Sequence, residues 1–238
     1  MDYQKVYERY WQDSGPYHWK GDEPKMAFHY KVARKYLKNK NKVLDVGCGD
    51  GVLLKLLPNA VGLEISEKAI KFCRDKGLKN KIVKGSCLAL PFKAHEFDGA
   101  AFLEVIEHLE EEDVKKALKE LHRVVKKDGI IVLSTPQRIP TLEWHINPVK
   151  KYFEGGKAPI FAKIILKDAK QSYGHIKEYI KDELAEMFKP FFKIKYLVAS
   201  GRKAKISCAR ITKDVNDYPF KFKAEVPFVK LIFVLENK

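Results

Sequence analysis

Residues 43–51 read Val-Leu-Asp-Val-Gly-Cys-Gly-Asp-Gly, and this stretch decides the fold class of the chain. An apolar, β-branched run ends at Asp45, and the alternating glycines that follow let the backbone turn sharply and approach a ligand closely. The next predicted strand, residues 60–64, ends in Glu64, about twenty residues after Asp45, where an acid can accept hydrogen bonds from ribose hydroxyls. The stretch therefore predicts a nucleoside-binding turn between a strand and a helix.

Strand patterns alternate with helix patterns on both sides of this turn. We expect strands at 42–46, 60–64, 81–84, 97–103 and 130–134. We expect helices at 24–38 (with Pro24 in the first turn), 51–57, 66–76 (with Ser66 as the N-cap) and 110–127. This alternation is typical of an α/β fold, in which crossover helices connect the strands of a mostly parallel sheet.

The pattern changes after Thr135. A Pro- and Gly-broken stretch is followed by a predicted helix at 181–188 and by predicted strands at 191–200 and 204–212. Residues 226–235 are strongly apolar, and we favour an extra strand or helix packed on the body over a patch for a membrane or partner. We expect one domain with five parts: an N-terminal helical cap (1–38), a cofactor-binding half (39–135), an acceptor-cap insertion (136–175), a C-terminal sheet portion (176–213) and an apolar tail (214–238).

Composition places the 238-residue chain among globular proteins. It has 46 Lys and Arg against 31 Asp and Glu, a net charge of +15, and only seven of the basic residues are Arg. The lysines are dispersed, which favours a solvated, heat-tolerant surface over a polyanion-binding stripe. The four cysteines form no C-x-x-C pair, and no apolar run approaches the length of a membrane span. We therefore expect a cytoplasmic protein.

The spacing of the glycine loop separates two kinds of nucleoside ligand. Dinucleotide sites follow G-x-G-x-x-G, whereas this loop is G-x-G-x-G. Asp45 and Asp50 bring negative charge to the loop, which suits a ligand with an ammonium group and no phosphate. S-adenosylmethionine (SAM) is such a ligand.

Four ordered motifs resemble the class I SAM-dependent methyltransferases. They are VLDVGCGDG at 43–51, LEIS at 63–66, GSCLALPF at 85–92 and FDGAAFLEVIEHL at 97–109, and the resemblance covers roughly residues 40–135. It implies a Rossmann-like sheet of seven strands in the order 3-2-1-4-5-7-6, with the seventh strand antiparallel and helices on both faces.

The resemblance also implies which residues hold the cofactor. The loop formed by Asp45, Gly47, Cys48 and Gly49 would face the methionine part of SAM. Glu64 would hold the ribose, Ile65 would pack on the adenine, Cys87 and Leu88 would lie along the adenine edge, and Glu104 would contact the cofactor. The family usually has Asp where this chain has Ser86, which accepts a hydrogen bond without charge.

Glu104, Glu107 and His108 form an E-x-x-E-H motif after the fourth strand of the cofactor-binding half. It resembles ubiquinone-pathway O-methyltransferases and 3′-terminal RNA 2′-O-methyltransferases, and the latter add a later His, here His175. In both subgroups the resemblance implies Mg²⁺ or another divalent cation, which would be bound by Glu104, Glu107, His108 and His175. The alternative is metal-free acid–base catalysis by His108, Glu107 and His175.

The acceptor stays open at this point. We expect methyl transfer to a hydroxyl of a small or lipophilic molecule, with an RNA 2′-O-methyltransferase and a non-catalytic SAM-binding module as alternatives. Aromatic residues at the N-terminus either anchor a helix on the body, which we favour, or form a lid over the site. They are Tyr3, Tyr7, Tyr10, Trp11, Tyr17 and Trp19.

Overall fold

The computed structural model describes residues 1–16, 19–20, 23–24, 26–78, 81–137, 176–201 and 229–238. Its helices are α1 (Tyr3–Ser14), α2 (Phe28–Leu37), α3 (Val52–Leu56), α4 (Glu67–Asp75), α5 (Glu111–Val124) and α8 (Lys181–Phe188), with a short 3-10 helix at Ile106–His108. Its strands are β1 (Trp19–Lys20), β2 (Glu23–Pro24), β3 (Val43–Val46), β4 (Ala60–Glu64), β5 (Ile82–Lys84), β6 (Phe97–Leu103), β7 (Val125–Gln137), β8 (Phe192–Gly201) and β9 (Val229–Asn237).

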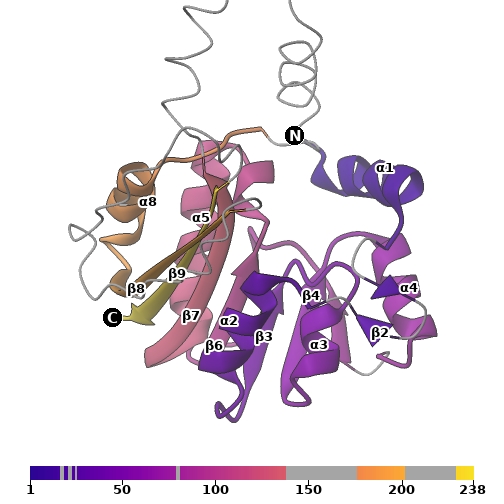
Figure 1. The fold of residues 1–238 in the computed structure, drawn as a ribbon, viewed down its shortest axis with the longest axis horizontal. Helices are drawn as coiled ribbons and strands as arrows, with labels where there is room; N and C mark the ends of the chain where they lie inside the picture. Colours follow the sequence, from indigo (N-terminus) through magenta and orange to yellow (C-terminus); the bar gives the residue numbers. More distant parts are fainter. Residues whose placement is uncertain (17–18, 21–22, 25, 79–80, 138–175, 202–228) are drawn as a thin grey trace, which may run out of the picture.

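Seven strands form one sheet in the order β5-β4-β3-β6-β7-β9-β8, while β1 and β2 make a separate hairpin (Figure 1). Counted along the chain, the seven strands have the order 3-2-1-4-5-7-6, which confirms the expected topology. Strands β3 to β7 are parallel, and β9 runs antiparallel to both β7 and β8. The strand order reverses at β3, since the chain first adds β4 and β5 on one side of it and then β6 and β7 on the other. Open α/β sheets bind ligands in the crevice at such a point.

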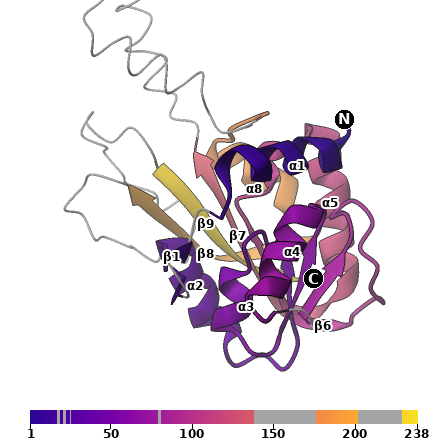
Figure 2. The same cartoon turned by 90° about the vertical axis from the view of Figure 1, so that its right-hand side faces the viewer.

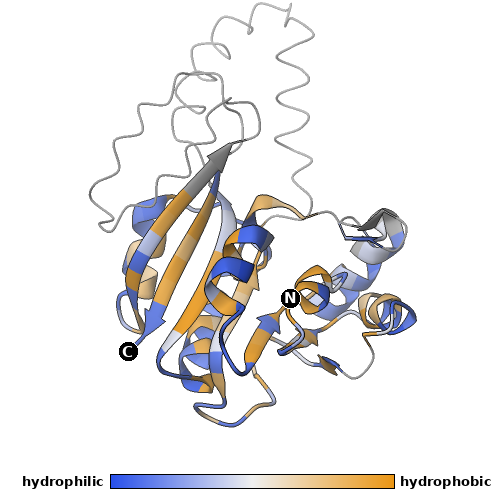
Figure 3. Ribbon diagram, turned by 60° about the horizontal axis from the view of Figure 1, so that its bottom comes forward, coloured by the Kyte–Doolittle hydropathy of each residue, from blue (hydrophilic) through white to orange (hydrophobic). Residues whose placement is uncertain are grey.

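Helices cover both faces of the sheet. One apolar cluster joins α5 and α8 to the sheet, and the other joins α2, α3 and Cys73 of α4 to the opposite face. Figure 2 shows α2 and α3 on the side away from α5. Apolar residues follow the central strands and polar residues the outer helix surfaces (Figure 3), because parallel strands are buried on both faces.

Local sequence explains where the two crossover helices begin. The Ser66 hydroxyl accepts a hydrogen bond from the Ala69 amide at 3.3 Å and so caps α4, as expected. Helix α5 has three acids in its first turn and His122 and Arg123 in its last, which matches the helix dipole. Both helices start at the carboxyl edge of the sheet: α4 shortly after β4, and α5 after β6 and the short 3-10 helix.

Several boundaries differ from the sequence expectation. Pro24 lies in β2 rather than in the first turn of α2, which begins at Phe28. Helix α5 ends at Val124 because β7 starts at Val125. The apolar tail forms β9, which is an internal strand of the sheet rather than an added one. The predicted strand at 204–212 lies outside the described residues, as does the predicted insertion at 136–175 except for its first two residues, which belong to β7. Within the described part no helix could span a membrane.

Candidate cofactor and acceptor site

The glycine loop between β3 and α3 is held in an open conformation. Gly47, Gly49 and Gly51 have φ values of 70°, 51° and 75°, a region that L side chains rarely adopt. The amides of Gly47 and Cys48 both donate to the Leu63 carbonyl, at 2.8 and 3.0 Å, which fixes the turn against β4. A Cβ atom on Gly49 would meet nothing within 4 Å, so this side of the loop is free to receive a ligand.

Three acids gather at this loop. The Glu64 carboxylate accepts hydrogen bonds from the amides of Gly49, Ile65 and Ser66 at 2.8–2.9 Å, so it ties the loop to the end of β4. Burial, together with the charges of Glu64 and Asp50, raises the pKa of Asp45 to about 8. The loop is therefore a buried, electron-rich site in which a cationic ligand relieves repulsion between carboxylates.

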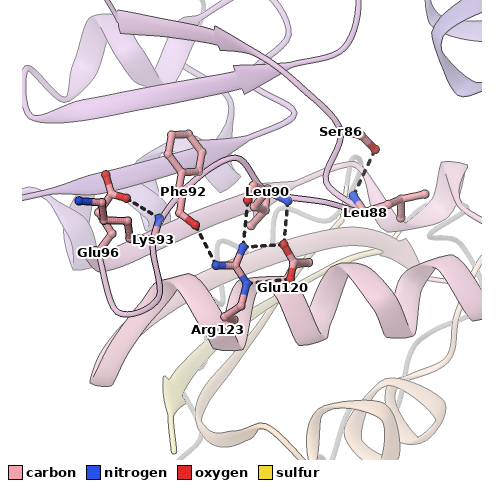
Figure 4. Close-up of polar contacts among 8 residues, drawn as sticks. All are labelled: Ser86, Leu88, Leu90, Phe92, Lys93, Glu96, Glu120 and Arg123. Atoms are coloured by element: carbon pink, nitrogen blue, oxygen red, sulfur yellow. Dashed lines mark hydrogen bonds and ion pairs between the residues drawn. The ribbon is translucent and has the colours of Figure 1, made fainter.

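The predicted adenine residues lie on a braced loop after β5. Ile65, Cys87 and Leu88 are partly buried against the core, whereas the Cys48 side chain packs behind the glycine loop against Gly62. The Ser86 hydroxyl accepts from the Leu88 amide at 3.2 Å (Figure 4).

Two side chains of α5 brace the same loop. Arg123 donates to the carbonyls of Phe92 and Leu90, and Glu120 accepts from the Leu90 amide at 2.7 Å, as Figure 4 shows. Arg123 and Glu120 also pair with each other at 2.7 Å. The loop is thereby fixed to the body of the domain at several points.

The E-x-x-E-H motif follows β6 at the same edge of the sheet. Glu104 has φ +57°, and its carboxylate accepts from the Ser134 hydroxyl at 2.6 Å and pairs with Lys230 at 2.5 Å. Glu107 is 1% exposed and accepts from the Thr135 hydroxyl at 3.1 Å. Burial, reinforced by the charge of Glu104, raises the pKa of Glu107 well above its usual value.

The surroundings of Glu104 and Glu107 do not fit a divalent cation. Both oxygens of Glu104 are engaged, one by Ser134 and the other by the Lys230 ammonium, whose positive charge opposes a second cation. In the described part of the chain, no group of three His, Cys, Asp or Glu side chains could hold a metal ion. His175, the fourth ligand that the resemblance implied, lies outside the described residues.

Helix α1 lies over the carboxyl edge of the sheet and covers the site. The Tyr3 hydroxyl donates to Asp113 at 2.8 Å and accepts from the Glu110 amide at 3.0 Å, which anchors the helix at the start of α5. At its other end, Trp11 packs against Phe72 of α4 with ring centroids 5.9 Å apart. Tyr3 and Trp11 thus have the anchoring role expected for the N-terminal aromatics, whereas Tyr17 lies outside the described residues. The anchored helix joins α5 to α4 (Figure 2).

Two tyrosines, Tyr7 of α1 and Tyr30 of α2, lie close to the acids of the site. Tyr7 of α1 contacts the His108 ring edge-on at 5.7 Å, and its pKa is raised by burial and then by the charges of Glu107 and Glu64. Tyr30 of α2 has its pKa raised by burial and by the charges of the glycine-loop acids and Glu104. Each tyrosine therefore lies close to acids from both halves of the predicted site.

Comparison with known proteins identifies the family. A family model described as a methyltransferase domain matches residues 44–133. Demethylmenaquinone methyltransferase of Geobacillus stearothermophilus is 32% identical over 176 residues, which cover 66% of this chain and 73% of that protein. The chain belongs to the class I SAM-dependent methyltransferases. The cofactor implied for this methyltransferase, SAM, fits the open glycine loop and its buried acids.

Other relatives match a smaller part of their own length. An uncharacterized protein of Methanocaldococcus jannaschii is 38% identical over 122 residues, 51% of this chain and 47% of that protein. A tRNA (carboxymethyluridine(34)-5-O)-methyltransferase of Arabidopsis thaliana is 38% identical over 95 residues, 39% of this chain and 23% of that protein. The methyltransferase thus spans about half of the first relative and a quarter of the second.

Solved structures share the fold of the methyltransferase at low identity. A SAM-dependent methyltransferase from Archaeoglobus fulgidus superposes with a TM-score of 0.58 and 19% identity, covering 87% of this chain and 90% of that one. A second structure comes from work on conversion of a disulfide bond into a thioacetal group during echinomycin biosynthesis. It superposes with a TM-score of 0.64 and 16% identity, covering 99% of this chain and 93% of that one. Both likenesses concern the fold alone.

Sequence reasoning missed the residues that surround the E-x-x-E-H motif. Ser134 and Thr135 come from the end of β7, Lys230 from the start of β9, and His29 and Tyr30 from α2. A hydroxyl pair at the end of a predicted strand is a usable signal, because parallel strands end at one edge. No local signal points to Lys230, since its place depends on where the tail enters the sheet.

Proposed function

We propose that this methyltransferase transfers a methyl group from SAM to a hydroxyl of a small or lipophilic acceptor. The observation that carries the proposal is the gathering of two groups of acids at the carboxyl edge of the sheet. One is Glu64 with the open glycine loop, the other is Glu104 with Glu107, and helix α1 lies anchored beside them. A cationic cofactor fits the first part, and an acceptor fits the second.

The side chains divide the work between binding and proton transfer. SAM, when bound, supplies a methyl group on a cationic sulfur. Glu64 holds the ribose, Gly49 leaves room for the methionine part, and Ile65 and Leu88 flank the adenine. Glu107 in its carboxylate form, a stronger base because burial raises its pKa, would take the hydroxyl proton as the acceptor oxygen attacks the methyl carbon and the sulfur keeps the electron pair of the bond that breaks. His108, packed against Tyr7, orients the acceptor beneath α1.

The printed names of relatives support a small acceptor. Two demethylmenaquinone methyltransferases are 31–32% identical over 176 residues, and a ubiquinone biosynthesis O-methyltransferase of Pelagibacter ubique is 32% identical over 115 residues. These names refer to lipophilic quinones. The covering helix with its aromatic side chains is consistent with a flat, apolar acceptor.

RNA is the second candidate acceptor. A tRNA methyltransferase is 38% identical over 95 residues, and the net charge of +15 attracts polyanions. In that case the 2′-hydroxyl of a ribose would take the place of the small acceptor, and His175 would join Glu107 and His108 at the site.

The test is a methylation assay on the full chain with SAM. Hydroxylated quinones and phenols are compared with a short RNA, and methylated products are detected by a mass increase of one methylene. We expect methylation of a small acceptor, unaffected by chelator and by moderate salt. Methylation of RNA alone, with binding that weakens steeply with salt, would favour the second candidate. Binding of SAM with no methylation of any acceptor would contradict the proposal and favour a non-catalytic module.

A further inference from the structure

Lys230 is the lysine that the tail brings to the E-x-x-E-H motif. It lies at the start of β9, and because β9 is antiparallel, its first residues reach the carboxyl edge of the parallel strands. In the register of β9 with β7, Lys230 lies opposite Pro136, and the next residue lies opposite Thr135. Thr135 in turn donates its hydroxyl to Glu107. The lysine therefore reaches Glu104 directly, and its charge also acts on Glu107.

The contacts of Lys230 hold its ammonium group on two sides. Nζ is 2.5 Å from an oxygen of Glu104 and 3.4 Å from Nδ1 of His29, which is 3% exposed. The side chains of Lys230 and Glu104 are 28% and 27% exposed, so water screens this pair less than it screens a surface pair. An ammonium held in this way is a fixed feature of the site.

Glu104 requires such support because its backbone is strained. Its φ of +57° is uncommon for a residue with a side chain and is kept only where surrounding contacts hold it. The Glu104 amide donates to the Ser134 carbonyl at 2.9 Å, and the side chain is held by Ser134 and Lys230. These contacts together keep the carboxylate at the end of β6.

We propose that Lys230 is a positioning residue whose ammonium group takes the place of a divalent cation beside Glu104. It keeps Glu104 in its left-handed conformation and supplies the counter-charge of that carboxylate on the acceptor side of the site. The inference rests on the proposed function for its effect on turnover, but the charge replacement itself is a property of the unliganded chain.

Metal binding tests the charge replacement without any acceptor. Wild type, Lys230→Ala and the control Lys193→Ala are titrated with Mn²⁺, and free Mn²⁺ is followed by electron paramagnetic resonance. Lys193 makes an exposed pair with Glu236 at the other end of β9, so it controls for loss of a sheet lysine. We expect Lys230→Ala alone to gain one Mn²⁺ site, which Glu104→Gln in the same chain abolishes. A Mn²⁺ site in the wild type, or none in Lys230→Ala, would overturn the proposal.

Turnover and chemical rescue test the positioning role. We expect Lys230→Ala to lower kcat about tenfold or more, since a lost hydrogen bond to a charged group is worth about 1.5–3 kcal/mol. Ethylamine should restore part of kcat in Lys230→Ala, whereas Lys193→Ala should keep wild-type kcat. Lys230→Met keeps the length of the stem, and it should fold, bind adenosylhomocysteine and turn over slowly without responding to ethylamine.

The outcomes separate the two proposals. Wild-type turnover in Lys230→Ala, or a slow Lys230→Ala that ethylamine does not rescue, would overturn the role of Lys230 and would leave the proposed function standing. If the wild type methylates no acceptor, the proposed function fails, and the Mn²⁺ titration still decides what Lys230 does.

Discussion

Asp45 should release its proton when SAM binds. In the unliganded protein its pKa of about 8, against an ordinary value of 3.8, means that about nine-tenths of the molecules carry the proton at pH 7. The difference corresponds to roughly 6 kcal/mol against the charged form. A bound cation in the glycine loop favours the charged form, because opposite charges attract more strongly in a buried site.

The size of the effect follows from these values. An opposite charge within about 4–6 Å lowers a carboxyl pKa by about 1–3, and a fall of about two brings Asp45 to about 6. Binding at pH 7 then releases about 0.8 proton, and binding at pH 9 releases about 0.1. The same values predict that affinity for SAM rises about 25-fold between pH 6 and pH 8.

Isothermal titration calorimetry in two buffers of different ionisation enthalpy measures the released proton. Adenosylhomocysteine is the matched ligand, because it carries the same amino-acid group without the charge on sulfur. Asp45→Asn is the matched variant, because it cannot titrate. We expect SAM to release a proton from the wild type and none from Asp45→Asn. The release with adenosylhomocysteine gives the part that the amino-acid ammonium group causes.

The unliganded protein provides an independent check of the sign. A carboxyl whose folded pKa is raised contributes stability below its unfolded pKa, and that contribution is lost as the pH rises through the folded pKa. Asp45 should therefore favour the folded state less and less from pH 3.8 to about 8. Relative to Asp45→Asn, the wild type should lose stability over this range. No proton release when SAM binds to the wild type, or parallel pH profiles for both proteins, would refute the reasoning.

Three further substitutions test other parts of the site. Gly49→Ala should lower the free energy of unfolding by about 1–2 kcal/mol, because residue 49 has a positive φ. It should weaken SAM binding by more than that, because the added Cβ points into the open side of the loop. Thermal melts measure the first effect and calorimetry the second. Ser86→Asp should raise affinity for adenosylhomocysteine about fivefold, since a charged acceptor makes the stronger hydrogen bond to the adenine amino group, and unchanged affinity would argue against that contact. Tyr3→Phe removes the hydroxyl that joins α1 to Asp113 and should lower Tm by about 2–4 °C, whereas an unchanged Tm would mean that α1 is held elsewhere.

Local chemistry in the sequence was sufficient to predict the cofactor half of the fold. Apolar strands, the N-cap at Ser66 and the alternating glycines each act over a few residues, so their positions can be read from the chain. The same locality placed Asp45, Gly49 and Glu64 at one turn, because neighbouring parallel strands end at one edge of the sheet. The strand order came from the family resemblance rather than from spacing.

The acceptor half depended on contacts between distant parts of the chain. The apolar tail could have been read as an added helix or strand, and only strand pairing shows that β9 lies between β7 and β8. That position brings Lys230 to Glu104, so a motif that resembled a metal site has a lysine for its counter-charge. The sequence by itself determined the strand–turn–helix unit and its acids. Tertiary structure decided which positive charge lies beside the acids of the E-x-x-E-H motif. The reason is that side chains far apart in the sequence meet only after the last strand has entered the sheet.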